Sequence, residues 1–494
     1  MQLQMNGTTW LCFIGVLLLW AASGMLAGDH RARSILKWRT ILFSLYGFAW
    51  IDFGVIYIFR FLALLYDPVL FRATQFPMWE MPNHILSKTF LCIGVYWSIF
   101  CLGMVITTKA VPRRLPGLLH RLTLIEAQGN LPLLDLLMVI CIFSTLLANS
   151  SWCLVPYRLL TPIGIVGSLW VIPPTIAWYV HFRGLRISLK RRLLYLVPGI
   201  LIFLLNPYRE HLLNGVLCVL IPFLLSKPRV KLARIIGLGM VFLLTASVVT
   251  YVHRSILWDG ESFQKASQYV SWEKWEEKPH QAPWISLVNR SSGFDASALT
   301  VLLVPGFFPY ENQNIVTELV VTAFMPRAID WEKSIVSRGR DFSTSIWAYT
   351  EGGQILPRES ALIAPSMFGD LWSLGGLETV ILGALIWGIL IGLLECWRRV
   401  LPPGAAAVLI VFLATRIGGG MERDFVHAAA TVIQGVIVLL IFIALLRGKI
   451  VRATSIIPVQ RFEKRVPYPQ QVQERVVSNA PLVPPLIQKK RDAN

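Results

Sequence analysis

The sequence predicts an all-α polytopic membrane protein with about eleven transmembrane helices and one large outer loop. Apolar residues make up 55% of the 494-residue chain and charged residues only 15%. Soluble domains carry roughly a quarter charged residues. The apolar residues are also grouped into stretches long enough to cross a hydrocarbon core of about 30 Å. Both observations are typical of a chain that folds in a bilayer.

The apolar stretches divide the chain into four parts. They run near 10–27, 40–65, 89–108, 133–150, 157–180, 192–206, 211–226, 234–252, 377–395, 404–418 and 427–446. We therefore expect N-terminal transmembrane helices over 1–252, followed by a large outer loop with amphipathic and re-entrant segments over 253–376. C-terminal transmembrane helices over 377–446 and a basic, proline-rich cytoplasmic tail over 447–494 complete the chain.

The positive charges indicate the orientation. Alternate connections are rich in Lys and Arg, around Arg31, Arg113, Arg183, Arg229 and Arg398, and the connections between them carry few. Because cytoplasmic connections are enriched in basic residues, this alternation places the N-terminus and the large loop outside and the tail inside. The net charge of +18 thus follows the topology. It does not indicate a nucleic-acid partner.

Motifs for metals, nucleotides and hydrolase nucleophiles are absent from the sequence. It contains no CxxC or Cys/His cluster of metal-ligand spacing, and no Walker A, GxGxxG, GxSxG or HExxH motif. We therefore expect no metal and no cofactor, and the sequence does not support coupling to ATP.

Two apolar stretches of the outer loop, 296–307 and 314–325, are too short to span a membrane. They fit amphipathic or half-buried helices at the outer surface. The segment 364–376 carries Asp370 and the glycines Gly369, Gly375 and Gly376 just before a span. This composition predicts a broken or re-entrant passage into the membrane.

Arginines on the outer side are the candidate ligands of a phosphate group. They are Arg209, Arg290, Arg327, Arg416 and Arg423. Each could instead be a solvated or snorkelling side chain. Together they are harder to explain that way, because outer connections normally contain few arginines. A guanidinium offers a planar fork of donors to phosphate oxygens, so the set suits a lipid-linked diphosphate.

These motifs resemble the oligosaccharide repeat unit polymerases of the O-antigen polymerase type, which include enterobacterial common antigen polymerases. The resemblance covers roughly 200–430. It is carried by Pro326-Arg327 through Lys333, by Gly369-Asp370 through Gly375-Gly376, by the turn around Arg209, by Arg290, and by Arg416 or Arg423. Near Lys333 the chain departs from the family pattern, with Asp330-Trp331 and Ser334 in place of Trp-Pro and Lys-Pro.

The resemblance implies a membrane glycosyltransferase of surface polysaccharide biosynthesis in the bacterial inner membrane, with a periplasmic N-terminus and a cytoplasmic C-terminus. The partners it implies are undecaprenyl-diphosphate-linked oligosaccharides, the lipid bilayer and a chain-length regulator protein. The arginines and Lys333 would bind the diphosphate, whose developing charge they stabilise. An acceptor hydroxyl needs a base. The candidates are Asp370, Glu359, Glu422, Asp424 and His427, with Asp370 first and helix capping as its alternative role.

Other functions remain open at this point. An O-antigen ligase-like transferase would use the same donor on the same side with a lipid A core as the acceptor. A polyprenyl-phosphate-sugar glycosyltransferase with an early acidic pair fits less well, because Asp67 and Glu80 are well separated. A transporter of lipid-linked glycans predicts ionisable residues within spans, for which Asp52, Arg60 and Asp135 are the candidates.

Overall fold

The structure is a computed structural model, and it describes the greater part of the chain. The described residues are 5–27, 44–67, 80–111, 131–149, 166–184, 187–205, 209–226, 293–324, 366–401, 403–418 and 423–454, with Leu3, Met421 and scattered positions between 237 and 288. The contacts divide the chain into two compact units, Met1–Leu446 and Arg447–Asn494.

The described residues are almost entirely helical and include no β-strand. The N-terminal helices are α1 (Gly7–Ser23), α3 (Leu45–Phe53), the π-helix η2 (Gly54–Phe59), α4 (Arg60–Tyr66), α5 (Asn83–Ala110) and α7 (Leu131–Asn149). The next are η4 (Leu169–Val171), α9 (Ile172–Phe182), α10 (Leu189–Leu205) and α11 (Arg209–Ser226). The last are α16 (Gly293–Leu303), α17 (Ile315–Phe324), α20 (Ser366–Val400), α21 (Pro403–Gly418) and α22 (Phe425–Thr454).

Among the described residues, four helical runs are long and apolar enough to cross a membrane, judged by length and composition. They are Gly7–Leu26, Leu45–Tyr66, Asn83–Ala110 and Ser366–Val400. Most of the other predicted spans correspond to shorter apolar helices, such as Pro132–Leu147 and Pro403–Gly418, and 234–252 lies largely outside the described residues. The structure therefore confirms a helical chain with candidate membrane spans, and it does not confirm the number eleven.

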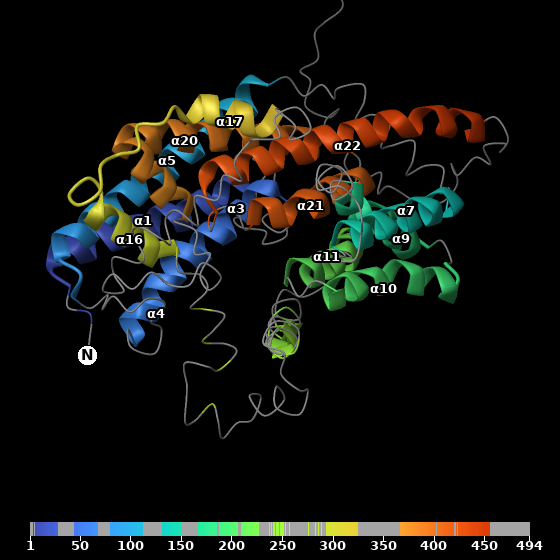
Figure 1. The fold of residues 1–494 in the computed structure, drawn as a ribbon, viewed down its shortest axis with the longest axis horizontal. Coiled ribbons are helices and arrows are strands. Elements are labelled where there is room, and N and C mark those ends of the chain that lie inside the picture. The colour runs from blue at the N-terminus through green and yellow to red at the C-terminus, as the bar shows by residue number, and fades with distance from the viewer. Residues whose placement is uncertain are drawn as a thin grey trace, which may run out of the picture. The chain divides into compact units, whose positions relative to one another are not determined.

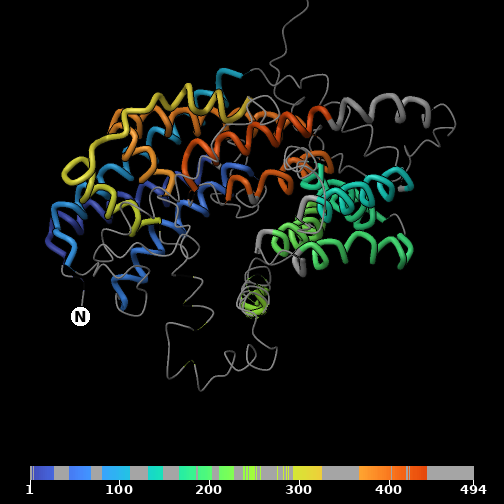
Figure 2. The backbone as a smooth tube through the Cα atoms, in the orientation of Figure 1, coloured from blue at the N-terminus to red at the C-terminus, as the bar shows by residue number. Residues whose placement is uncertain are grey.

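The helices pack in two groups that α21 connects (Figures 1 and 2). One group contains α1, α3, α4, α5, α16 and α20. The other contains α7, α9, α10 and α11. Helix α21 contacts α3 and α20 in the first group and α9 and α11 in the second. The apolar stretch at 404–418 is therefore an internal helix, and its side chains from Gly404 to Ala414 are buried.

Helices α5 and α20 form the most extensive contact, and glycines allow their backbones to approach closely. A Cβ atom at Gly388 would lie 2.2 Å from the carbonyl oxygen of Phe100. A Cβ at Gly392 would lie 3.0 Å from the oxygen of Met104, and one at Gly103 would lie 2.8 Å from that of Leu385. Small residues spaced four apart are the usual device for close helix packing in a bilayer, where apolar burial alone does not drive association.

Helix α20 is broken at Gly375–Gly376. Gly376 has a φ of +68° and a ψ of −142°, a conformation that favours glycine. The break frees carbonyl groups of the preceding turn. The N–H of Glu311 donates to the oxygen of Ser373 at 3.0 Å, and the N–H of Asn312 donates to that of Leu374 at 2.9 Å. The segment that joins α16 to α17 therefore supplies the hydrogen bonds that the broken helix lacks.

Candidate functional site at the start of α22

Buried carboxylates gather around the first residues of α22. We call Asp52, Asp370, Met421, Asp424 and Phe425 the α22 N-terminal cluster. Asp370 Oδ2 accepts from the N–H of Phe425 at 2.9 Å, and Asp424 Oδ1 accepts from the N–H of His427 at 2.7 Å. Asp52 Oδ2 accepts from the N–H of Met421 at 2.9 Å. The first N–H groups of a helix lack intrahelical partners and favour negative charge, so α22 begins among carboxylates from three segments.

The short first half of α20, residues 366–374, is fixed between α16 and the start of α22. The N–H of Met367 donates to the oxygen of Met421 at 2.9 Å. Ser366 Oγ accepts from the N–H of Gly369 at 3.1 Å and lies 2.8 Å from Ser297 Oγ on α16. These bonds hold Asp370 in place, because it lies in the same two helical turns.

Asp370 occupies an unexpected position. Its side chain is only 1% exposed and lies within a helix, although the sequence suggested a residue at the margin of a span. Capping was the alternative role considered for it, and the helix concerned is α22 rather than the helix that follows Asp370 in the chain. Its role as a general base stays a prediction.

Asp424 precedes the first turn of α22, His427 lies within that turn, and the two residues differ in exposure. Asp424 is buried, and its carboxylate accepts the N–H of His427 in the manner of a helix N-cap. The His427 side chain is exposed. Among the candidate bases whose side chains the structure describes, His427 is therefore the one a substrate reaches from outside the protein.

Arg416 and Arg423 lie on either side of the connection between α21 and α22. The Arg416 side chain folds back along α21: its Nη1 donates to the carbonyl oxygen of Phe412, and its guanidinium carbon lies 4.2 Å from the centre of the Phe412 ring. A Cβ atom at Gly435 of α22 would lie 3.3 Å from Arg416 Nε. Glycine at 435 thus leaves room for the guanidinium beside α22. Arg423 is half-buried, two residues before Phe425.

The side chains of the remaining candidate residues lie outside the part of the chain that the structure describes. Arg290, Arg327, Lys333, Glu359 and Glu422 lie outside the described residues. Arg209 is the first residue of α11, and its side chain is also outside the described part. The structure thus brings together Asp370, Asp424 and His427 through α22, with Arg416 and Arg423 at the adjoining connection.

A buried ion pair joins α4 to α16, and no sequence pattern links its two residues. Arg60 Nε donates to Asp295 Oδ1 at 3.0 Å and Nη2 donates to Oδ2 at 2.6 Å, with both side chains 0% exposed. Arg60 Nη1 also donates to the carbonyl oxygen of Val288 at 3.2 Å. The sequence alone shows Arg60 and Asp52 as charges within an apolar run, which indicates a functional role or a buried partner. It does not show which residues these two side chains bond to.

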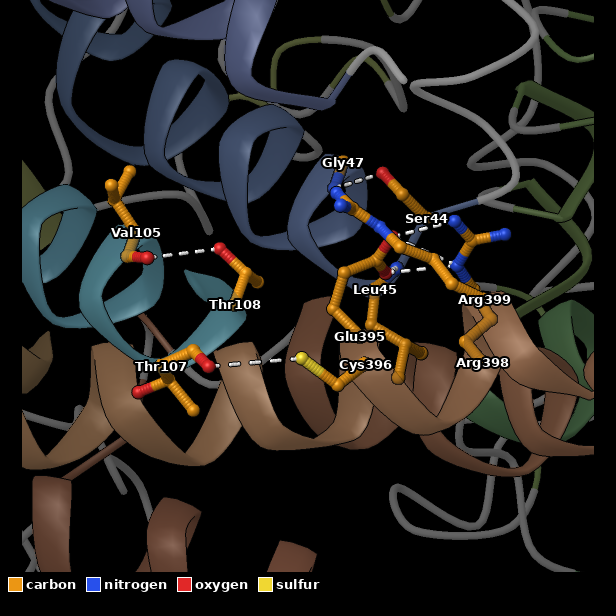
Figure 3. A network of polar contacts seen from close by, with 10 residues as sticks. All are labelled: Ser44, Leu45, Gly47, Val105, Thr107, Thr108, Glu395, Cys396, Arg398 and Arg399. Carbon is orange, nitrogen blue, oxygen red and sulfur yellow. Dashed lines mark hydrogen bonds and ion pairs between the residues drawn. The ribbon is translucent and has the colours of Figure 1, made fainter. Parts of the chain in front are cut away.

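The other end of α20 carries a similar buried carboxylate (Figure 3). Glu395 accepts from the N–H of Leu45, the first residue of α3, at 3.1 Å. It also pairs with Arg398 at 2.6 Å and with Arg399 at 3.2 Å. Helix α20 thus places one acidic side chain at the start of α3 and another, Asp370, at the start of α22. Glu395 is already surrounded by arginines, so we interpret this end as structural.

Comparison with known proteins adds no assignment. Among the described residues, no group of three His, Cys, Asp or Glu side chains could hold a metal ion. No protein-family model matches the chain, and no curated protein or solved structure matches it either.

Proposed function

We propose that the protein is a membrane glycosyltransferase that polymerises lipid-diphosphate-linked oligosaccharide repeat units on the outer face of a bacterial inner membrane. The growing chain leaves its undecaprenyl diphosphate and is transferred to a hydroxyl of a fresh repeat unit. Arginines bind the diphosphate, and a base takes the proton of the hydroxyl. The proposal rests on the sequence resemblance and on the placement of Arg416 and His427.

The observation that carries the proposal is the position of Arg416. It lies in the last turn of an otherwise apolar helix, and its guanidinium packs on Phe412 beside Gly435. A cation in the last turn of a helix is stabilised by the helix dipole, and a guanidinium at that position also offers a planar fork of donors to phosphate oxygens. The exposed His427 lies in the first turn of the neighbouring helix α22, eight residues before Gly435, so a base for the hydroxyl lies about 12 Å along that helix from the arginine for the diphosphate.

The test is a reconstitution. Purified protein in phospholipid vesicles receives an undecaprenyl-diphosphate-linked repeat unit with no nucleotide and no metal added. We expect a ladder of lengthened lipid-linked glycans. A product that forms only after a lipid A core is added would establish a ligase instead. Transfer of unchanged lipid-linked glycan between the leaflets would establish a transporter.

One observation favours the transporter as the second candidate. Asp52, Arg60 and Asp295 are buried charges in or against an apolar helical run, as a translocation pathway requires. Two hydrogen bonds join the Arg60 and Asp295 side chains, and Arg60 makes a third to the carbonyl oxygen of Val288. These bonds suit a pair that holds two helices together better than a site that binds a transported substrate, so we place the polymerase first.

A further inference from the structure

Helix α17 has an apolar row toward the protein and a second apolar row away from it, beside the exposed Thr317 and the half-buried Glu318. Ile315, Leu319 and Ala323 are buried against the neighbouring helices. The adjacent row of Val316, Val320 and Phe324 is 45%, 50% and 59% exposed. A helix at a water interface usually carries polar residues on its outward face. The exposed row of α17 is instead suited to an apolar surrounding.

The ends of α17 lie at different depths along the bundle. Just before its start, Glu311 and Asn312 bond to Ser373 and Leu374 at the break in α20. Near its other end, the Gln434 side-chain amide donates to the carbonyl oxygens of Thr322 at 2.9 Å and Ala323 at 3.4 Å. Gln434 comes nine residues after Phe425, the first residue of α22. At 1.5 Å per residue this is about 14 Å along α22. Figures 1 and 2 show α17 running beside α20 and α22.

The bonds from Gln434 are those that an inserted helix end requires. The last four carbonyl groups of any helix lack an intrahelical N–H partner. In water they are solvated, but within hydrocarbon they need a donor from the protein. Gln434 stands in the otherwise apolar stretch from Val432 to Leu446, and its amide reaches two of these carbonyl groups. Its position in α22 is thereby explained.

We propose that α17 is inserted into the leaflet at which α22 begins, with Val316, Val320 and Phe324 against lipid acyl chains and Gln434 capping its C-terminal end. This differs from the sequence expectation of a helix lying at the outer surface over 314–325. The inference does not depend on the proposed function. Arg327, a candidate diphosphate ligand, comes three residues after Phe324, so the depth of α17 bears on that function.

The depth of each position can be measured by lipid quenching. The full chain carries one added cysteine, in variants Phe307→Cys, Val316→Cys, Val320→Cys, Phe324→Cys and Ile389→Cys, each labelled with a bimane fluorophore. The unaltered chain, whose described cysteines are buried or half-buried, provides the background. Vesicles of phosphatidylcholine contain a lipid with its nitroxide either at carbon 5 or at carbon 12 of the acyl chain.

We expect the ratio of deep to shallow quenching to rise from Val316 through Val320 to Phe324, because these positions are spread over about 12 Å along the helix axis. Phe307, exposed in the segment before α17, should give the lowest ratio, and Ile389, exposed in the middle of α20, a high one. Equal ratios at Val316, Val320 and Phe324 would show a helix lying flat. Quenching of all three by aqueous iodide would place them in water. Either result overturns the proposal.

The capping role of Gln434 is tested in the same assay. In Gln434→Leu the carbonyl groups of Thr322 and Ala323 lose their donor, so the label at Phe324→Cys should move toward the surface. Thr431→Val is the matched control, because Thr431 lies on the same helix and its hydroxyl donates to His427 within α22. An unchanged depth at Phe324 in Gln434→Leu would refute the cap, whereas a shift in Thr431→Val would show that any polar loss from α22 has the same effect.

Discussion

The carboxylate of Asp370 accepts the backbone N–H of Phe425 at 2.9 Å, so a residue of α20 holds the start of α22. The two residues are separated by 55 positions in the sequence. This bond makes Asp370 a cap for a helix other than its own, and it connects the broken half of α20 to the connection that carries Arg423. The role of Asp370 is therefore the first point to test.

Asp370→Asn keeps an acceptor oxygen for Phe425, whereas Asp370→Ala removes it. We expect Asp370→Asn to unfold at nearly the wild-type temperature. Asp370→Ala should lose about 0.5–2 kcal/mol of unfolding free energy, as is usual for a lost helix N-cap. Thermal melts in detergent, followed by circular dichroism, provide the comparison. If Asp370 acts only as a helix cap, Asp370→Asn should also lengthen glycans at the wild-type rate. A folded but inactive Asp370→Asn protein would assign the catalytic base to Asp370.

Arg416→Ala should impair the transfer reaction if this arginine stabilises the departing diphosphate. Loss of one such donor typically lowers the rate by about 10²–10³. Arg416→Lys should recover part of the rate, because an ammonium keeps the charge and loses the planar fork. The measurement is the rate of glycan lengthening at equal amounts of folded protein. Lys190→Ala is the control, since Lys190 is exposed in the first turn of α10. Normal rates in both arginine variants would remove Arg416 from the site.

The Arg60–Asp295 pair should stabilise the fold only as an intact pair. Arg60→Met leaves a buried carboxylate without its cation, which typically costs about 3–5 kcal/mol. Replacing both residues, as Arg60→Met with Asp295→Leu, removes both charges and should restore most of the loss. Thermal unfolding of the two single variants and the double variant forms the cycle. If the double variant is as unstable as the sum of the single ones, the two residues are not coupled.

Gly388→Ala should weaken the contact between α5 and α20, because the added Cβ would lie 2.2 Å from the Phe100 oxygen. The backbones must then separate, and we expect a lower unfolding temperature. Gly15→Ala is the matched control, since no atom lies within 4 Å of the Cβ that it adds to α1. That substitution should be neutral or slightly stabilising, by up to about 1 kcal/mol, because alanine favours a helix over glycine. Equal melting temperatures in the two variants would contradict this packing.

The orientation predicted by the basic connections can be tested with reporter fusions. Fusions after Arg192 and after Gly260 should report opposite sides of the membrane, because the first position follows a basic connection and the second lies in the large outer loop. A reporter active only in the periplasm, paired with one active only in the cytoplasm, gives a positive signal on each side. Two fusions on the same side would mean that the number of spans between them is wrong.

Much of the helical class could be predicted from the sequence, because hydropathy is a property of contiguous residues. The runs near 10–27, 40–65 and 89–108 correspond to long apolar helices of the structure. Hydropathy does not fix the number of membrane spans, since an apolar stretch such as 404–418 fits a helix buried in protein as well as one in lipid. The glycines at 375 and 376 indicated an irregular segment, and the structure breaks α20 there.

The candidate site could be predicted only as a set of residue types. Arginines and carboxylates at the margins of apolar runs indicate chemistry, but a sequence does not state which of them meet. Asp370 accepts a hydrogen bond from Phe425. Arg60 donates to Asp295, 235 positions away, and Glu395 accepts from Leu45, 350 positions away. Composition and charge order by themselves determined a helical membrane protein and a predicted orientation. Only tertiary packing decided the partners of the buried charges, because a carboxylate removed from water bonds to whichever donor the neighbouring helices bring within hydrogen-bond distance.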